Sequence, residues 1–175
     1  MSISGSVREY MIPLGKFPHV SCPATLRDAF AMLHLTTSEK GDMFRNVVVL
    51  DEQERFLGLL SLKNMLLALM PDYLRPGKGH FQGSDNDNSA LAVLWQDDCV
   101  EHCHLAHKIA ARDHVSPVPV SAGADEPLSK ALFLFATTPH YILPVIEGKR
   151  LVGLLRLVDV FDEVMIEVLS ERPAA

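Results

Sequence analysis

The side chains whose types and spacing most clearly suit the binding of a ligand are Arg156 and Asp159. They follow the stretch Gly153-Leu154-Leu155. An apolar stretch that passes into an amphipathic run predicts a strand leading into a helix, so both side chains are expected at the start of that helix. Free backbone N–H groups at a helix start suit a phosphate, and a carboxylate one turn in can accept hydrogen bonds from vicinal ribose hydroxyls. Arg156 could meet a polyphosphate directly. The pattern therefore indicates a candidate nucleotide-binding turn.

A second stretch repeats this pattern with different polar side chains. Ser61 and Asn64 follow Gly58-Leu59-Leu60 at the same spacing. The Ser61 hydroxyl suits a phosphate, whereas the Asn64 amide can bind a ribose only without the assistance of a charge. Each turn thus contains half of a nucleotide site, and we expect at most one good site, at Asp159. The alternative is that Asp159 is a carboxylate stabilised by the helix dipole alone.

The surroundings of the two turns are repeated as well. In each copy a basic residue, Arg55 or Arg150, precedes an apolar strand, the glycine, an apolar pair and an amphipathic run. Repetition on this scale indicates two similar modules. We divide the chain into a first repeat over 7–70, a connection over 71–110 and a second repeat over 111–170. Each repeat is too small to bury a core alone, so the two are expected to share one.

The hydrophobic pattern of each repeat predicts an extended lead-in, a helix, two strands and a second helix. Thr25 and Asp28 have the spacing of a capping box, which predicts the start of the first helix. In the second repeat, Pro144 lies within a predicted strand. A proline there indicates an edge strand, or a position whose missing N–H faces away from the ladder.

The connection contains a second group of side chains that could do chemistry. The composition of residues 75–89 predicts a loop, and residues 91–112 are predicted to form a helix. On that helix Cys99, Cys103 and His107 would share one face. Such a stripe could hold a soft metal such as zinc. Its first and last positions are about 12 Å apart, at a rise of 1.5 Å per residue, so the three ligands do not converge on one ion. We therefore expect no metal site and keep a metal-binding protein as the least favoured alternative.

The two copies resemble motifs of the cystathionine-β-synthase (CBS) type, and the pair resembles a Bateman module. The lead-ins Tyr10-Met11-Ile12-Pro13 and His114-Val115-Ser116-Pro117 carry the resemblance together with the two turns. It implies a mixed α/β (α+β) fold of two β-α-β-β-α repeats related by a pseudo-two-fold axis, with a ligand cleft between them. It also implies a homodimer of pairs. By analogy, four further residues would touch the base of a ligand through backbone and apolar contacts: Val20, Val118, Val120 and Pro144.

Composition excludes several classes of function. The chain has 175 residues, a formal net charge of −6 and no basic stripe, which argues against a nucleic-acid partner. The most apolar run, 56–70, is too short to span a bilayer and is interrupted by Lys63 and Asn64, so we expect no membrane segment. Three cysteines, an odd number, suit a reducing cytosol better than a disulfide framework. We therefore expect a cytoplasmic protein.

The resemblance implies a function of regulation rather than catalysis. Members of this family usually sense adenosine-containing ligands and regulate an attached or partner protein. We accordingly expect a non-enzymatic module that binds AMP, ADP, ATP or S-adenosylmethionine, requires no cofactor and signals to a separate effector protein. The main alternative is a structural or dimerisation module with a degenerate cleft, because each of the two motifs is only half complete.

Overall fold

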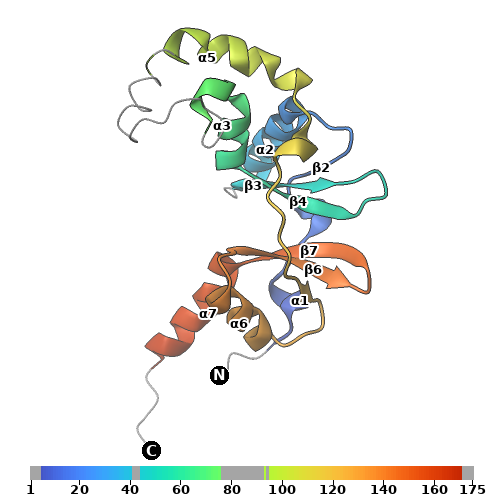
Figure 1. Ribbon diagram of the computed structural model, residues 1–175. Coiled ribbons are helices and arrows are strands. Elements are labelled where there is room, and N and C mark those ends of the chain that lie inside the picture. The colour runs from blue at the N-terminus through green and yellow to red at the C-terminus, as the bar shows by residue number, and fades with distance from the viewer. Residues whose placement is uncertain (1–4, 41–43, 76–92, 94, 171–175) are drawn as a thin grey trace, which may run out of the picture. The chain divides into compact units, whose positions relative to one another are not determined.

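The computed structural model describes residues 5–40, 44–75, 93 and 95–170 of the chain. The chain forms two compact units (Figure 1). We call His19–Ser116 the repeat-one unit, and Met1–Pro18 together with Pro117–Ala175 the repeat-two unit. Both units are mixed α/β structures, as predicted. The N-terminal segment thus belongs to the unit that contains the second repeat.

The repeat-one unit contains the predicted elements of the first repeat: β2 (His19–Ser21), α2 (Leu26–Lys40), β3 (Asn46–Leu50), β4 (Phe56–Ser61) and α3 (Leu62–Leu69). The sheet order is β2-β3-β4, with β2 parallel to β3 and β4 antiparallel to it. Helices α2 and α3 lie on one face of this sheet, where Leu26 and Met65 join Val47, Val49 and Leu60 in the core (Figure 1). The strands alternate their side chains, so this apolar set faces the helices.

The repeat-two unit repeats this order with an added N-terminal piece: α1 (Val7–Tyr10), β1 (Ile12–Pro13), a 3-10 turn (Leu14–Lys16), β5 (Ala122–Gly123), α6 (Leu128–Thr137), β6 (Ile142–Glu147), β7 (Arg150–Arg156) and α7 (Leu157–Leu169). The sheet order is β1-β7-β6-β5. β6 and β7 form an antiparallel hairpin, and β5 runs parallel to β6. The core is built from α6, α7 and the strands, with Leu128, Leu143, Leu155 and Val160 fully or almost fully buried.

The two lead-ins are exchanged between the repeats. Ile12, in the lead-in of the first repeat, pairs antiparallel with Leu154 of β7 in the second repeat. Ser116, in the lead-in of the second repeat, pairs with Leu59 of β4, and the two residues exchange backbone hydrogen bonds of 2.9 and 3.0 Å. The exchange extends into the cores, because Val7 is buried in the repeat-two unit. Each repeat therefore completes its packing with the lead-in of the other.

Pro144 does not lie on an edge strand. β6, which contains it, is flanked by β7 on one side and by β5 on the other. β5 pairs with Val145 and Ile146, so Pro144 lies one residue before that pairing begins. The proline is tolerated in a central strand because β5 is too short to reach it.

The connection is helical over a shorter stretch than predicted. Helix α5 (Trp95–His104) is followed by 3-10 turns over Leu105–Lys108 and Ala111–His114, so the predicted helix over 91–112 is wrong beyond His104. The reason is a tertiary contact: the Leu26 N–H donates to the Ile109 carbonyl, and the Ala111 N–H to the Ala24 carbonyl. This pairing holds Ile109 and Ala110 extended against the start of α2. The predicted loop over 75–89 lies outside the described residues from residue 76 on.

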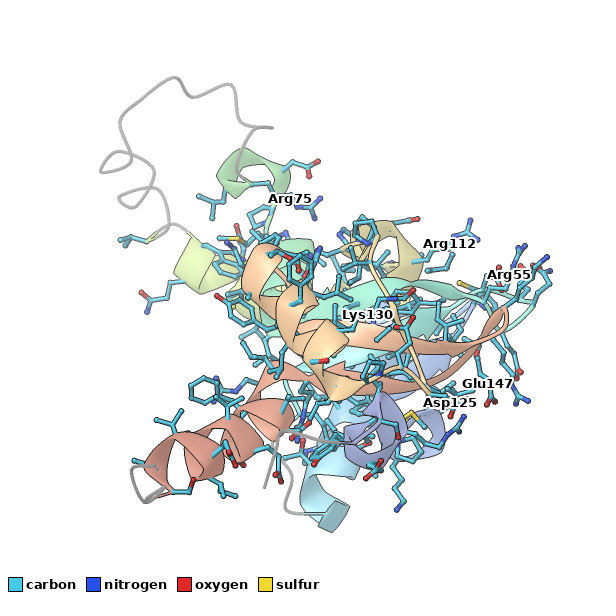
Figure 2. The ribbon with its side chains drawn as sticks, turned by 90° about the horizontal axis from the view of Figure 1, so that it is seen from below. Arg55, Arg75, Arg112, Asp125, Lys130 and Glu147 are labelled. Carbon is cyan, nitrogen blue, oxygen red and sulfur yellow. The ribbon has the colours of Figure 1, made fainter. Side chains whose placement is uncertain are left out.

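Two side chains fix helix ends in the repeat-one unit. The Thr25 N–H and hydroxyl donate to the Asp28 carboxylate at 2.7 and 2.8 Å, which confirms the predicted capping box. The hydrogen bonds from Thr25 lower the pKa of Asp28. At the end of α3, Arg75 donates to the carbonyls of Met70 and Ala68 at 2.8 and 3.0 Å (Figure 2). Its charge suits the negative end of the helix dipole. Among the described residues, no helix combines the length and the apolar character needed to cross a bilayer.

Candidate functional site

The repeat-two turn, residues 156–159, joins β7 to α7. Arg156 ends the strand and is the N-cap of the helix, with an extended backbone of φ −100° and ψ 141°. The Leu157 N–H donates to the Tyr141 carbonyl at 2.9 Å, which ties the start of the helix to the residue just before β6. Asp159 lies in the first turn of α7, where the partial positive charge of the helix start favours a carboxylate. The strand-to-helix turn predicted from the sequence is therefore present.

Within this turn, Arg156 and Asp159 bind each other. Arg156 Nε donates to Asp159 Oδ2 at 2.7 Å, and Arg156 Nη2 donates to Asp159 Oδ1 at 2.5 Å. The side chains are 21% and 24% exposed, so the pair is half-buried and only partly screened by water. A two-bond pair between guanidinium and carboxylate is stronger and more directional than a single charged hydrogen bond. Opposite charges at i and i+3 on a helix are the sequence signal for such a pair.

The repeat-one turn, residues 61–64, is closed by a neutral capping box. The Asn64 N–H donates to Ser61 Oγ at 3.1 Å, and both the Ser61 N–H and its hydroxyl donate to Asn64 Oδ1. The Asn64 amide also donates to Ser116 Oγ at 3.2 Å. The spacing of Ser61 and Asn64 predicts the first set of contacts. It gives no signal for Ser116, which reaches this turn because the lead-ins are exchanged.

The four residues assigned by analogy differ in what they can offer a ligand. The side chain of Val20 is buried in the core of the repeat-one unit, and Pro144 is buried in β6. A ligand beside either would meet mainly their backbone. Val118 and Val120 are half-buried in the segment before β5, and Val120 packs against the core of the repeat-two unit. The eight predicted residues divide between the units: Ser61, Asn64 and Val20 lie in the repeat-one unit, and Val118, Val120, Pro144, Arg156 and Asp159 in the repeat-two unit.

Comparison with known families decides the assignment. The family model of the CBS domain matches the chain twice, over residues 7–71 and 111–166, which together make up more than half of its length. The chain belongs to the CBS-domain family. Both repeats are CBS domains, and the chain is a CBS-domain pair. Among curated proteins, none matches this chain in sequence.

Solved structures support the same fold at low sequence identity. A CBS domain-containing protein of unknown function from Kribbella flavida is 13% identical, with a TM-score of 0.66, over 92% of this chain and 98% of that chain. Another from Bacillus anthracis is 14% identical, with a TM-score of 0.65, over 93% and 94%. CBSX2, solved in complex with AMP, is 20% identical, with a TM-score of 0.59, over 93% and 98%. At these identities the likeness establishes the fold alone.

The helix of this CBS-domain pair that contains Cys99 and Cys103 is the one that the sequence offers as a metal site. Among the described residues, no group of three or more His, Cys, Asp or Glu side chains is placed to hold an ion. His102 Nδ1 lies 2.9 Å from the Asp98 carbonyl, and His107 Nδ1 lies 2.7 Å from the His104 carbonyl. Burial and the neighbouring Cys99 raise the pKa of Cys103, which disfavours the thiolate that a metal needs. These contacts give the metal-binding alternative no support.

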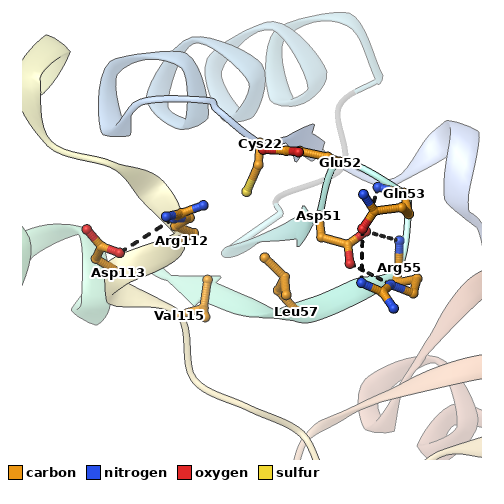
Figure 3. Close-up of a pocket in the computed structure, with 9 residues that line it drawn as sticks. All are labelled: Cys22, Asp51, Glu52, Gln53, Arg55, Leu57, Arg112, Asp113 and Val115. Carbon is orange, nitrogen blue, oxygen red and sulfur yellow. Dashed lines mark hydrogen bonds and ion pairs between the residues drawn. The ribbon is translucent and has the colours of Figure 1, made fainter.

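A surface pocket opens beside the β3–β4 turn (Figure 3). Leu57 and Val115 form its apolar side, and Arg112 lies 3.8 Å from Asp113 at one end. At the other end, Asp51 accepts the Gln53 and Arg55 N–H groups at 2.8 Å. The hydrogen bond from the Arg55 N–H is the main cause of the lowered pKa of Asp51. None of the eight predicted residues lines this pocket, which lies at the opposite end of β4 from Ser61.

Proposed function

We propose that this CBS-domain pair is a regulatory module that binds an adenosine-containing nucleotide at the repeat-two turn. The observation that carries the proposal is Asp159, which lies half-buried in the first turn of α7. A carboxylate there can accept hydrogen bonds from a ribose diol, and the adjacent guanidinium can bind a phosphate. The complex of CBSX2 with AMP supports an adenine nucleotide as the ligand class.

The proposed role is non-enzymatic and is exerted on a separate effector protein in the cytoplasm. A ligand can shift the conformation of the module only if it binds one conformation better than another. Binding at the start of α7 would change how that helix is held, and the effector would respond to this change. No cofactor is needed for such a role. The three free thiols, Cys22, Cys99 and Cys103, are compatible with a reducing compartment.

Calorimetry with matched variants tests the proposal. Three proteins are each titrated with AMP, ADP, ATP and S-adenosylmethionine: the wild type, Asp159→Ala and Asp162→Ala. Asp162 is an exposed carboxylate on the same helix, so its replacement removes the same charge without touching the turn. We expect at least one ligand to bind wild type and Asp162→Ala alike. Asp159→Ala should bind that ligand about tenfold more weakly or worse, because a charged hydrogen-bond acceptor is lost.

A structural or dimerisation module without a ligand is the second candidate. The capping box at Ser61 and Asn64 and the pair at Arg156 and Asp159 favour it, because both turns already satisfy their polar side chains internally. This candidate predicts no heat of binding for any of the four ligands. It also predicts that none of them raises the melting temperature of the wild-type protein.

We also propose that the module self-associates as a homodimer through α7. Six large apolar side chains of this helix are exposed: Val158, Phe161, Met165, Ile166, Val168 and Leu169. A contiguous apolar surface of this kind is typical of an interaction site. Light scattering on wild type should give the mass of a dimer, and Phe161→Glu should give that of a monomer. Val100→Glu, on the exposed face of α5, is the control and should remain dimeric.

A further inference from the structure

The carboxylate proposed to bind a ribose is already occupied. Both oxygens of Asp159 accept a hydrogen bond from the Arg156 guanidinium, at 2.7 and 2.5 Å. In a two-bond pair the planar guanidinium lies directly opposite the carboxylate and takes up one acceptor position on each of its oxygens. A ribose can therefore form its two hydrogen bonds only if Arg156 moves away from the carboxylate or shares it.

The repeat-one turn provides the contrast. There the corresponding side chain, Asn64, is neutral, accepts a hydrogen bond from the Ser61 N–H and donates one to Ser116 Oγ, and the residue at the position of Arg156 is Ser61. The repeat-two turn is thus the one of the two that combines an acceptor for a diol with a cation for an anion. These two groups pair with each other in the structure, and their charges match the ribose and phosphate ends of a nucleotide.

We propose that Arg156 gates the Asp159 site and makes it selective for phosphorylated adenosine compounds. In the structure the guanidinium binds both oxygens of the carboxylate. A ligand with a phosphate can replace Asp159 as the partner of the guanidinium, because a phosphate also accepts two charged hydrogen bonds from an arginine. Adenosine offers no such group, and S-adenosylmethionine carries a cationic sulfonium instead of a phosphate. This inference depends on the proposed function, since it concerns the selectivity of the same site.

The gate predicts opposite effects on two ligands when Arg156 is removed. Adenosine no longer has to displace the guanidinium, so Arg156→Ala should bind adenosine about fivefold more tightly, the scale expected for a partly exposed ion pair. ATP loses its guanidinium contact, so its preference over adenosine should fall about tenfold or more. Arg156→Lys keeps the charge but loses the planar fork, so it should bind adenosine more tightly than wild type and keep most of the preference for ATP.

The experiment is a titration of wild type, Arg156→Ala, Arg156→Lys and Arg150→Ala with adenosine, AMP and ATP at one salt concentration. Arg150 is an exposed arginine at the opposite end of β7, so Arg150→Ala controls for the loss of a positive charge and should behave as wild type. A melting curve of each variant verifies folding. If Arg156→Ala does not fold, the comparison of wild type with Arg156→Lys still tests the gate, because it predicts tighter binding of adenosine.

The outcomes separate the gate from the function on which it depends. Binding of ATP to wild type, with adenosine affinity unchanged in Arg156→Ala and Arg156→Lys, overturns the gate and leaves the nucleotide site in place. A failure of every protein, including Arg156→Ala, to bind any of the three ligands overturns the proposed function itself. Tighter binding of adenosine combined with a weaker preference for ATP supports both.

Discussion

At the scale of single residues, the two repeated glycines have a steric role. Gly58 and Gly153 are buried in β4 and β7, at the points where the exchanged lead-ins cross these strands. A Cβ on Gly58 would lie 2.6 Å from the Ser116 carbonyl oxygen, and one on Gly153 would lie 2.6 Å from that of Ile12. Backbone oxygens cannot move aside as a flexible side chain can. The glycines therefore allow the lead-in backbone to approach each strand closely.

Replacing either glycine should loosen the corresponding lead-in. We expect Gly58→Ala and Gly153→Ala each to lower the free energy of unfolding by about 2 kcal/mol, the usual cost of forcing an extra group into a packed site. Gly15→Ala is the control, because a Cβ at Gly15 meets nothing within 4 Å. It should be neutral or slightly stabilising. Urea denaturation of the three variants measures these differences, and equal effects for all three would contradict the steric argument.

For single residues, the sequence predicts the position in the fold but not the hydrogen-bond partner. Asp159 and Asn64 can be located at helix starts, because the glycine, the apolar pair and the amphipathic run fix their position. Their partners cannot be assigned in the same way. Ser116 reaches Asn64 from 52 positions along the chain. Arg156 has the spacing of a helix ion pair and equally the position of a phosphate ligand, and one sequence does not distinguish the two roles.

At the scale of elements, backbone hydrogen bonds and ion pairs of Arg8 hold the short helix α1 against the rest of the repeat-two unit. The N–H groups of Val7 and Arg8 donate to the carbonyls of Glu126 and Ala124 at 2.9 and 2.8 Å. The Arg8 side chain donates to Asp125 at 2.9 Å and to Glu147 at 2.6 Å, and the two carboxylates lie close together in Figure 2. The hydrogen bond from Arg8 lowers the pKa of Asp125. A helix of four residues has too few internal bonds to persist without such contacts.

The contribution of this contact to stability should depend on pH in the acid range. The pKa of Asp125 is lower in the folded protein than in the unfolded chain, so the contact stabilises the fold above the unfolded value of about 4. The stabilisation is lost as the pH falls through the lower, folded pKa. We expect Arg8→Gln to be less stable than wild type at pH 7, with a difference that shrinks below about pH 4. Lys149→Gln is the control for charge, and its difference from wild type should not follow this course. Denaturation at several pH values makes the comparison.

The order of elements is predictable from the sequence because it depends on local periodicity. The apolar spacing of 26–33 and the β-branched run of 46–50 match α2 and β3, since both patterns are set by the nearest neighbours along the chain. Helix α5 ends earlier than its pattern indicates, because Ile109 and Ala111 form hydrogen bonds with the backbone at the start of α2. A contact between segments more than 80 residues apart overrides local propensity, and a local pattern contains no information about it.

At the scale of the whole molecule, the exchange of lead-ins links distant parts of the chain. Val7 is fully buried in the core of the repeat-two unit, with Leu128 and Val160 in the same cluster. Val115 packs against the core of the repeat-one unit. The two repeats and their lead-ins can be recognised in the sequence. The strand with which each lead-in pairs cannot, because that pairing depends on contacts between distant segments. A mutation near one end of the first repeat should therefore act on the second repeat.

Hydrogen exchange on two matched variants tests this coupling. We expect Val7→Ala to cost about 2 kcal/mol through the cavity it leaves. It should speed amide exchange in β6 and β7 without changing that in β3 and β4, because local opening follows the loss of packing in its own unit. Val115→Ala makes the same chemical change in the other lead-in, so it should act in reverse, on β3 and β4. If Val7→Ala instead speeds exchange in β3 and β4 alone, the lead-in packs on its own repeat and the exchange of lead-ins is wrong.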